Sequence, residues 1–251
     1  MGPESQSGKL TSTVETINFQ QIDAVLFDLG GTLVTMDFVW IARELLALDI
    51  VCDSAALARA ETAARLLVSA KLAENNQPPI GFPFFLKTIL TEVLDEPADR
   101  IDELVTKLTP ILLPGGLSQK LWSSIDQATR DVLLEFSQLG LPLAVVSNSD
   151  GTAEANVTAL GLRDYFDIVI DSAVAGYEKP DPRIFQFALD AIGVEPNRAI
   201  YVGDLYSVDV VGARSAGIHP VLLNPYGHWR DVDCFTVSDL NELLTCFKNR
   251  T

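Results

Sequence analysis

The first stretch of the sequence suited to chemistry is an aspartate followed by a glycine-rich turn. Asp28 ends an apolar run and comes directly before Leu29, Gly30 and Gly31. Because glycines let other groups approach the backbone closely, the Asp28 carboxylate is open enough to act as a nucleophile or a metal ligand. Taken alone, the same pattern fits an ordinary aspartate in a turn. Whether Asp28 is a functional residue depends on which other side chains the fold brings close to it.

Three later stretches carry groups that bind phosphate or a divalent cation. The Ser147 hydroxyl and the backbone N–H groups near Asn148 suit phosphoryl oxygens. Lys179, set between prolines in Glu-Lys-Pro-Asp-Pro, suits the neutralisation of charge on a transferring phosphoryl group. Asp204 and Asp209 supply two hard carboxylates of the kind that Mg²⁺ prefers. Each pattern alone also fits a strand end, a solvated lysine or a helix cap.

The segments around these residues predict an α/β fold. Short apolar runs without clean alternation indicate buried parallel strands at residues 24–28, 143–147, 168–172, 199–203 and 220–223. Helical patterns lie between most of them, at residues 126–139, 182–191 and 207–216. This order predicts a Rossmann-like, doubly wound parallel sheet. The four chemical stretches lie at the carboxyl ends of strands or just after them, so they converge at one edge of that sheet.

One long segment breaks the alternation of strands and helices. Between the first strand and residue 113 the chain is helical in pattern, with helices expected at residues 38–48, 54–74, 83–94 and 99–112. An insertion at this point would lie over the strand ends as a lid that excludes water and selects the substrate. We therefore expect a helical cap at 37–113, a core at 19–36 and 114–251, and a polar N-terminal arm at 1–18.

Composition excludes some partners. The 251 residues carry a net charge of −16 without any Lys/Arg-rich run, which argues against nucleic acid or an anionic membrane surface as partner. No apolar stretch approaches the roughly 18 residues that a membrane span needs. Cys52, Cys234 and Cys246 are scattered, which fits a reducing compartment and predicts a cytoplasmic location. Monomer and homodimer both remain open.

Together these stretches resemble the haloacid dehalogenase-like hydrolase superfamily, in the subgroup with a helical cap after the first strand. The resemblance runs from about residue 23 to 244 and is most specific in YFDIVIDSAVAGYEKPDPRIF and YVGDLYSVDVVGARSAG. It implies a Mg²⁺-dependent phosphatase that attacks a small phosphorylated metabolite and forms an aspartyl-phosphate.

The resemblance also implies roles for individual residues. Asp28 would be the nucleophile, and Mg²⁺ would bind to Asp28, the backbone carbonyl of Gly30 and Asp204, with Asp209 close or acting through water. Lys179 would also offset the crowding of carboxylates. The expected phosphate-binding residues are Gly31, Thr32, Ser147, Asn148 and Lys179.

The chain departs from the family pattern at Gly30. Phosphatases of this family usually carry there a second Asp that protonates the leaving group, and such assistance is typically worth about 10²–10⁴-fold. Three interpretations stay open. Asp37 replaces this acid–base group, unless it only begins a helix. Lys71 forms an imine with a phosphonate substrate, as in related phosphonatases, unless it lies on a solvated helix face. In the third interpretation the protein binds phosphorylated ligands or a partner protein without useful turnover.

Overall fold

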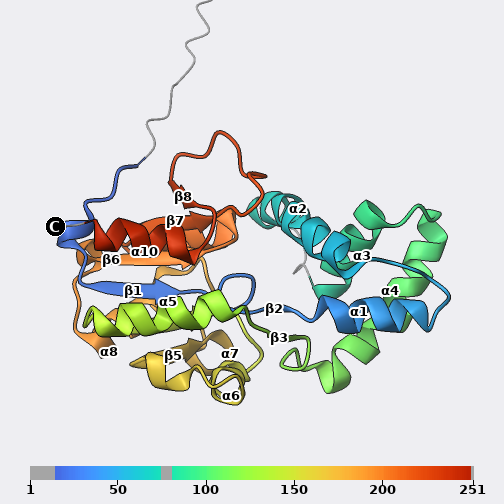
Figure 1. Cartoon of the computed structure of the whole chain (residues 1–251), viewed down its shortest axis with the longest axis horizontal. Helices are drawn as coiled ribbons and strands as arrows, with labels where there is room; N and C mark the ends of the chain where they lie inside the picture. The colour runs from blue at the N-terminus through green and yellow to red at the C-terminus, as the bar shows by residue number, and fades with distance from the viewer. Residues whose placement is uncertain (1–14, 75–80, 250–251) are drawn as a thin grey trace, which may run out of the picture.

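The chain folds into two units that lie side by side (Figure 1). The computed structural model describes residues 15–74 and 81–249. The first unit, here called the sheet unit, is a parallel sheet covered by helices. The second, here called the helical unit, consists of α1 to α4. In the described part of the chain no helix combines the length and the apolar character that a membrane crossing requires.

The sheet unit contains one six-stranded parallel sheet in the order β5-β4-β1-β6-β7-β8. Its strands are β1 (Ala24–Phe27), β4 (Leu143–Ser147), β5 (Ile168–Asp171), β6 (Ala199–Gly203), β7 (His219–Leu223) and β8 (Phe235–Val237). The chain winds outward from β1 in both directions, so β1 lies where the strand order reverses. In open α/β sheets this is the place where ligands bind. The predicted Rossmann-like fold class is thus confirmed, with β8 as an additional strand.

Helices bury both faces of this sheet, which explains why the strands lack alternation. On β1, Val25 and Phe27 pack into one apolar cluster, and Leu26 packs into another on the opposite face. The first face is covered by α5 (Gln127–Gln138), α6 (Ala153–Ala159) and α10 (Leu240–Lys248), and the second by α8 (Pro182–Ile192) and α9 (Val211–Ser215). The short α7 (Ser172–Ala175) follows β5 directly.

The helical unit has an apolar core of its own, to which Ile41, Leu57, Leu86 and Leu104 contribute fully buried side chains. Its helices are α1 (Phe38–Leu46), α2 (Ser54–Ala73), α3 (Phe82–Val93) and α4 (Ala98–Leu112), close to the predicted ranges. The chain enters and leaves this unit through two short antiparallel strands, β2 (Thr35–Met36) and β3 (Trp122–Ser124). The sequence did not predict this pair.

The remaining turns are short. They are the 3₁₀ turns η1 (Phe19–Gln21), η2 (Pro114–Gly116), η3 (Arg163–Tyr165) and η4 (Pro196–Arg198), and the π-helical turn η5 (Tyr206–Val210). The expected N-terminal arm lies outside the described residues up to residue 14. At residue 15 the chain is already attached to the sheet unit, since the Glu15 carboxylate pairs with His219 at 3.1 Å.

Candidate active site

Asp28 lies at the centre of the sheet edge, directly after β1. Its backbone N–H donates to the Val202 carbonyl at 2.8 Å, which continues the pairing of β1 with β6 and fixes the residue. Its carboxylate oxygen Oδ1 accepts from Lys179 Nζ at 2.7 Å. Burial raises the pKa of Asp28 above its ordinary value, an effect that the Lys179 ammonium opposes and the Asp209 carboxylate increases. The nucleophile predicted from sequence therefore lies in a charged, desolvated position.

Lys179 links two of the carboxylates. Its Nζ donates to Asp28 Oδ1 at 2.7 Å, to Asp209 Oδ1 at 2.8 Å and to the Tyr201 hydroxyl at 2.7 Å. Burial disfavours the ammonium, but Asp209 and Asp28 raise the pKa of Lys179 well above its ordinary value. The two carboxylates therefore favour the ammonium form of Lys179 beside Asp28.

Asn148 positions this lysine. Lys179 N–H donates to Asn148 Oδ1 at 2.7 Å, and Asn148 Nδ2 donates to the Lys179 carbonyl at 3.0 Å. The amide side chain is thus engaged on both atoms. Asn148 also lines the pocket, and the expected contact of its backbone N–H with phosphate stays a prediction.

Asp209 organises the turn after β6. Its Oδ2 accepts from the backbone N–H groups of Asp204 at 3.0 Å and Leu205 at 2.8 Å. This fold-back requires Gly203, because a Cβ there would lie 2.4 Å from the Asp209 Cγ. The π-helical turn η5 carries Asp209, and π turns occur frequently at functional sites. Gly203 is a functional position that the sequence analysis did not identify.

The three aspartates converge in the way that a metal site needs. One carboxylate oxygen each from Asp28, Asp204 and Asp209 lies within 4.8 Å of the others. Burial raises the pKa of Asp204 well above its ordinary value; the Arg65 guanidinium opposes this shift, and the Asp209 and Asp28 carboxylates add to it. Hard oxygen donors carrying excess negative charge fit Mg²⁺. The residues present therefore fit the metal that the resemblance implies.

We expect Asp28 and Asp204 to contribute less to the stability of the metal-free protein as the pH rises. The pKa values of Asp28 and Asp204 are raised in the folded state, so their contribution is complete below the ordinary carboxyl pKa of 3.8 and is lost as the pH rises through the raised values. Thermal unfolding should then show a Mg²⁺-dependent increase in Tm that is large near neutral pH and small near pH 4. At 100 times Kd the expected stabilisation is about 2.7 kcal/mol. Asp204→Asn should remove the Mg²⁺ effect; an equal effect at both pH values would contradict this account.

A buried ion pair from the helical unit reaches into the same site. Arg65 on α2 donates from Nε and Nη2 to the Glu61 carboxylate at 3.0 and 2.7 Å. Its Nε lies 3.1 Å from Asp204 Oδ2, and its Nη1 donates to the Gly31 carbonyl at 3.3 Å. Four buried carboxylates thus face two buried cations, Lys179 and Arg65. The excess negative charge is what a divalent cation would balance. The sequence analysis missed this pair, although two opposite charges four residues apart in the alanine-rich segment ARAETAARLL are a readable signal.

Arg65→Met is expected to destabilise the protein by about 3–5 kcal/mol, because it leaves the Glu61 carboxylate buried without its cation. Urea unfolding measures this cost. Arg59→Met, on an exposed position of the same helix, is the matched control and should leave the midpoint unchanged. The double variant with Glu61→Met should recover most of the loss. A double variant as unstable as the single one would show that the charge imbalance is not the cause.

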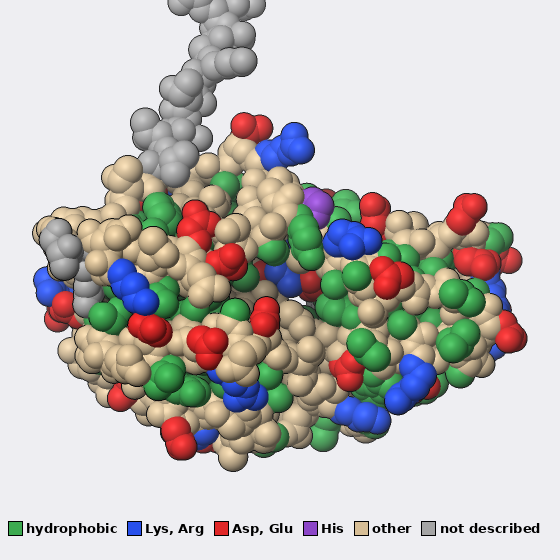
Figure 2. Space-filling model, viewed as in Figure 1, with side chains coloured by type: hydrophobic (Ala, Val, Ile, Leu, Met, Phe, Trp, Pro, Cys, Tyr) green, Lys and Arg blue, Asp and Glu red, His purple; other side chains and the backbone are tan. Residues whose placement is uncertain are grey.

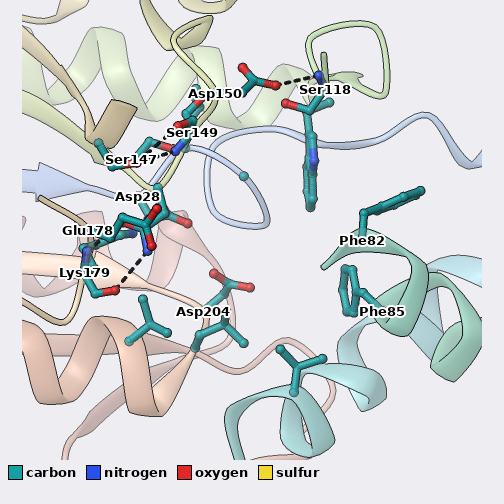
Figure 3. Close-up of a pocket in the computed structure, with 18 of the residues that line it drawn as sticks. Asp28, Phe82, Phe85, Ser118, Ser147, Ser149, Asp150, Glu178, Lys179 and Asp204 are labelled. Carbon is teal, nitrogen blue, oxygen red and sulfur yellow. Dashed lines mark hydrogen bonds and ion pairs between the residues drawn. The ribbon is translucent and has the colours of Figure 1, made fainter. Parts of the chain in front are cut away.

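The site opens into a pocket of about 660 Å³ between the two units. Figure 3 shows Asp28, Lys179 and Asp204 on the side of the sheet, with Phe82 and Phe85 of α3 across the pocket from them. The face drawn in Figure 2 is hollowed between the units, and charged side chains are visible inside the hollow. Each unit therefore supplies one wall of the pocket.

Not every expected phosphate-binding residue occupies the pocket. Ser147 lines it, as predicted. The Thr32 hydroxyl is buried and has no hydrogen-bond partner among the described residues, so its donor and acceptor are both unused. The Gly31 N–H donates to the Val34 carbonyl at 2.7 Å, so it is not free for phosphate and that prediction is wrong. Gly31 has φ of +83°, and a Cβ there would lie 2.6 Å from Asp204 Oδ2.

The two substitutes considered for the missing acid lie elsewhere. Asp37 is the N-cap of α1, where its Oδ1 accepts from Trp40 N–H at 2.8 Å, and it is not among the described residues that line the pocket. Lys71 is also absent from that lining and pairs with Glu74 at 3.1 Å on the surface of α2. The helix-cap and solvated-face interpretations therefore describe these residues in this structure.

The space beside Gly30 is taken by an aromatic ring. A Cβ at Gly30 would lie 3.4 Å from the Trp122 indole. Trp122 belongs to β3, and its carbonyl accepts from Asn156 Nδ2 at 2.9 Å. The position that would carry the family's second aspartate thus faces an apolar surface.

The fold and the site together define a class of α/β hydrolases with an aspartate at the end of the first strand. The family model for haloacid dehalogenase-like hydrolases matches residues 22–217. The chain therefore belongs to this family of hydrolases.

Similar proteins include human haloacid dehalogenase-like hydrolase domain-containing protein 3, 47% identical over 41% of this chain and 40% of that protein. The bovine counterpart is matched over 34% of its length. A glyceraldehyde 3-phosphate phosphatase from Methanothermobacter thermautotrophicus is 28% identical over 81% of this chain and 86% of its own. The structure of a HAD phosphatase from Thermococcus onnurineus has a TM-score of 0.54 and 27% identity, covering 89% of this chain and 97% of that one.

Proposed function

We propose that this protein is a Mg²⁺-dependent phosphatase that hydrolyses small phosphomonoesters through an aspartyl-phosphate at Asp28. The surroundings of Asp28 give the proposal its strongest support. The Asp28 carboxylate lies 2.7 Å from the buried Lys179 ammonium, within 4.8 Å of two further carboxylates, and it lines a pocket large enough for a metabolite. This arrangement lets an anionic nucleophile meet an anionic substrate.

The similar proteins support the reaction class. The Methanothermobacter relative that aligns with most of this chain is a phosphatase, and so is the Thermococcus neighbour. A phosphoserine phosphatase from Thermus thermophilus is 41% identical over 36% of this chain. The printed substrates of these proteins differ from one another, and this chain aligns with only part of several of them. We therefore propose the class of reaction and not one of those substrates.

In the proposed mechanism an oxygen of Asp28 attacks phosphorus, and the bond from phosphorus to the ester oxygen breaks. Lys179 fixes the attacking carboxylate and offsets charge on the phosphoryl oxygens, to which Ser147 donates its hydroxyl. Asp28, Asp204 and the Gly30 carbonyl would hold Mg²⁺, with Asp209 ordering the turn that carries Asp204. Bound there, Mg²⁺ would supply Lewis-acid stabilisation of the phosphoryl oxygens. Water then hydrolyses the aspartyl-phosphate.

The direct test is hydrolysis of a panel of phosphomonoesters with Mg²⁺, with excess chelator, and with the Asp204→Asn variant. We expect release of phosphate that chelator abolishes and Mg²⁺ restores. Phosphate release that is indifferent to chelator would contradict the metal assignment. Tight binding of a phosphate ester without turnover of any ester would favour the binding role over the enzyme.

A further inference from the structure

The pocket has two chemically different walls. The wall formed by the sheet unit carries the carboxylates and Lys179, as described above. Across the pocket, α3 presents an aromatic surface on which Phe82 and Phe85 face the reacting groups (Figure 3), whereas α2 contributes the Glu61–Arg65 ion pair. The apolar residues of the helical unit that line the pocket are Val68, Leu72, Phe82 and Phe85, and Leu113 and the β3 residue Trp122 line it as well. The leaving group of a substrate attacked by Asp28 therefore has an apolar surface to lie against.

The nearby groups are poor proton donors for that leaving group. Lys179 Nζ already donates to Asp28, Asp209 and the Tyr201 hydroxyl, which engages all three of its N–H groups. Arg65 donates to the Glu61 carboxylate and the Gly31 carbonyl, and a guanidinium does not give up its proton in proteins. Among the described lining residues there is no histidine and no cysteine.

The carboxylates that line the pocket outside the aspartate cluster are Glu61, Asp150 and Glu178. Both oxygens of Glu61 accept from Arg65, at 3.0 and 2.7 Å. Asp150 accepts from Ser118 N–H at 2.8 Å and from the Thr152 hydroxyl at 2.5 Å. Burial raises the pKa of Asp150, but these hydrogen bonds lower it by more, so it stays ionised. Glu178, which is exposed and labelled beside Lys179 in Figure 3, is the one carboxylate left for a direct test.

We infer that the substrate is a phosphate ester on an unsaturated carbon, that is an aryl or enol phosphate with an apolar face. This inference rests on the proposed function. An alkyl ester would have to leave as a strongly basic alkoxide, which needs a proton in the transition state. A phenolate or enolate leaves as a stabilised anion and takes its proton from bulk water afterwards. The same flat, unsaturated group packs well against the aromatic surface of α3.

Without an acid–base group, the two steps of the reaction depend differently on the leaving group. When Asp28 attacks, the bond from phosphorus to the aryl oxygen breaks, and the electron pair leaves with the aryl oxygen. In the second step water attacks the phosphorus of the aspartyl-phosphate, the bond from phosphorus to the Asp28 oxygen breaks and restores the carboxylate, and the proton of the attacking water passes to bulk solvent without help. We therefore expect kcat/KM to depend steeply on the leaving group, while kcat is similar for all good aryl esters. A burst of phenol release should precede the steady state.

The experiment compares phenyl phosphate with benzyl phosphate in the Mg²⁺-loaded wild-type enzyme. Both carry the same ring, but benzyl phosphate has an alkyl alcohol as leaving group. We expect kcat/KM for the benzyl ester to be lower by at least about 10²-fold, the lower end of what general acid catalysis supplies. Glycerol phosphate, which lacks both the ring and a good leaving group, should be poorer still. Equal kcat/KM for phenyl and benzyl phosphate would overturn the inference.

Two variants make the comparison sharper. If Glu178 supplies the proton, the wild type turns over benzyl phosphate well and Glu178→Gln does not, which would also overturn the inference. We expect Glu178→Gln to leave the ratio between the two esters unchanged. Phe85→Leu keeps aliphatic packing in the helical unit and should raise KM for phenyl phosphate by more than KM for acetyl phosphate, which has no ring; an equal change for both would show that Phe85 does not contact the ring.

The same hydrolysis measurements distinguish the proposed reaction from the proposed substrate class. If no ester is hydrolysed in a manner that depends on Asp28, the proposed function fails. If hydrolysis depends on Asp28 but alkyl esters react as fast as aryl esters, the phosphatase stands and only the substrate class is wrong.

Discussion

Asp28→Asn is expected to abolish phosphate release, by about 10⁵–10⁶-fold, the scale on which removal of a covalent nucleophile acts. The amide fills the same space but does not attack phosphorus. The folded protein should remain at least as stable at neutral pH, because burial already disfavours the ionised carboxylate at this position. Steady-state kinetics and urea unfolding together separate this loss of chemistry from a loss of fold.

Asp37→Asn is the matched control for that experiment. Asparagine caps helices about as well as aspartate, so the N-cap of α1 and the activity should both survive. The reverse pattern, in which Asp37→Asn is inactive and Asp28→Asn is active, would contradict the assignment of the nucleophile and restore the acid–base role considered for Asp37.

Lys179→Met is expected to remove activity and also about 3–5 kcal/mol of stability. The side chain is fully buried between Asp28 and Asp209, and without it these carboxylates face each other with no cation between them. Because protonation of Asp28, whose pKa is raised by burial, relieves this repulsion, the difference from wild type in urea unfolding should shrink as the pH falls toward the ordinary carboxyl pKa of 3.8.

Lys107→Met is the control for charge removal, because Lys107 pairs with Glu103 on the surface, with its side chain 48% exposed. Exposed pairs contribute little, so its unfolding midpoint should match that of wild type. A Lys179→Met protein as stable as wild type at neutral pH would show that the aspartate cluster is neutralised by something other than this lysine.

The parts of the fold that the sequence predicted are those with long apolar patterns. The five expected strands appear as continuous apolar runs of four or five residues, and the four helices of the helical unit are long enough for burial to leave a helical period. The helices α6 and α10 were not predicted. The strands that were missed are β2, β3 and β8, which have two or three residues each and carry no period. They form through pairing with distant strands, which local pattern does not report.

The same distinction applies to the site. Asp28, Ser147, Lys179 and Asp204 were predicted because each lies at the end of a strand or next to a proline or glycine, in positions that parallel topology brings together. Roles set by contacts between distant segments were not predicted.

The side chain of Asn148 binds the backbone of Lys179, a contact between two loops of the sheet unit that are 31 residues apart. Arg65 reaches the site from the other unit, and the Trp122 ring lies beside Gly30. Contacts between such distant segments are not visible in the sequence alone.

The most direct test of the central claim is mass spectrometry of the protein quenched in acid within the first turnovers, with Mg²⁺ and phenyl phosphate. We predict one added phosphoryl group on the peptide that contains Asp28, absent when chelator replaces Mg²⁺ and absent in Asp28→Asn. Rapid hydrolysis with the phosphoryl group on another residue, or with no covalent adduct at any quench time, would contradict the account.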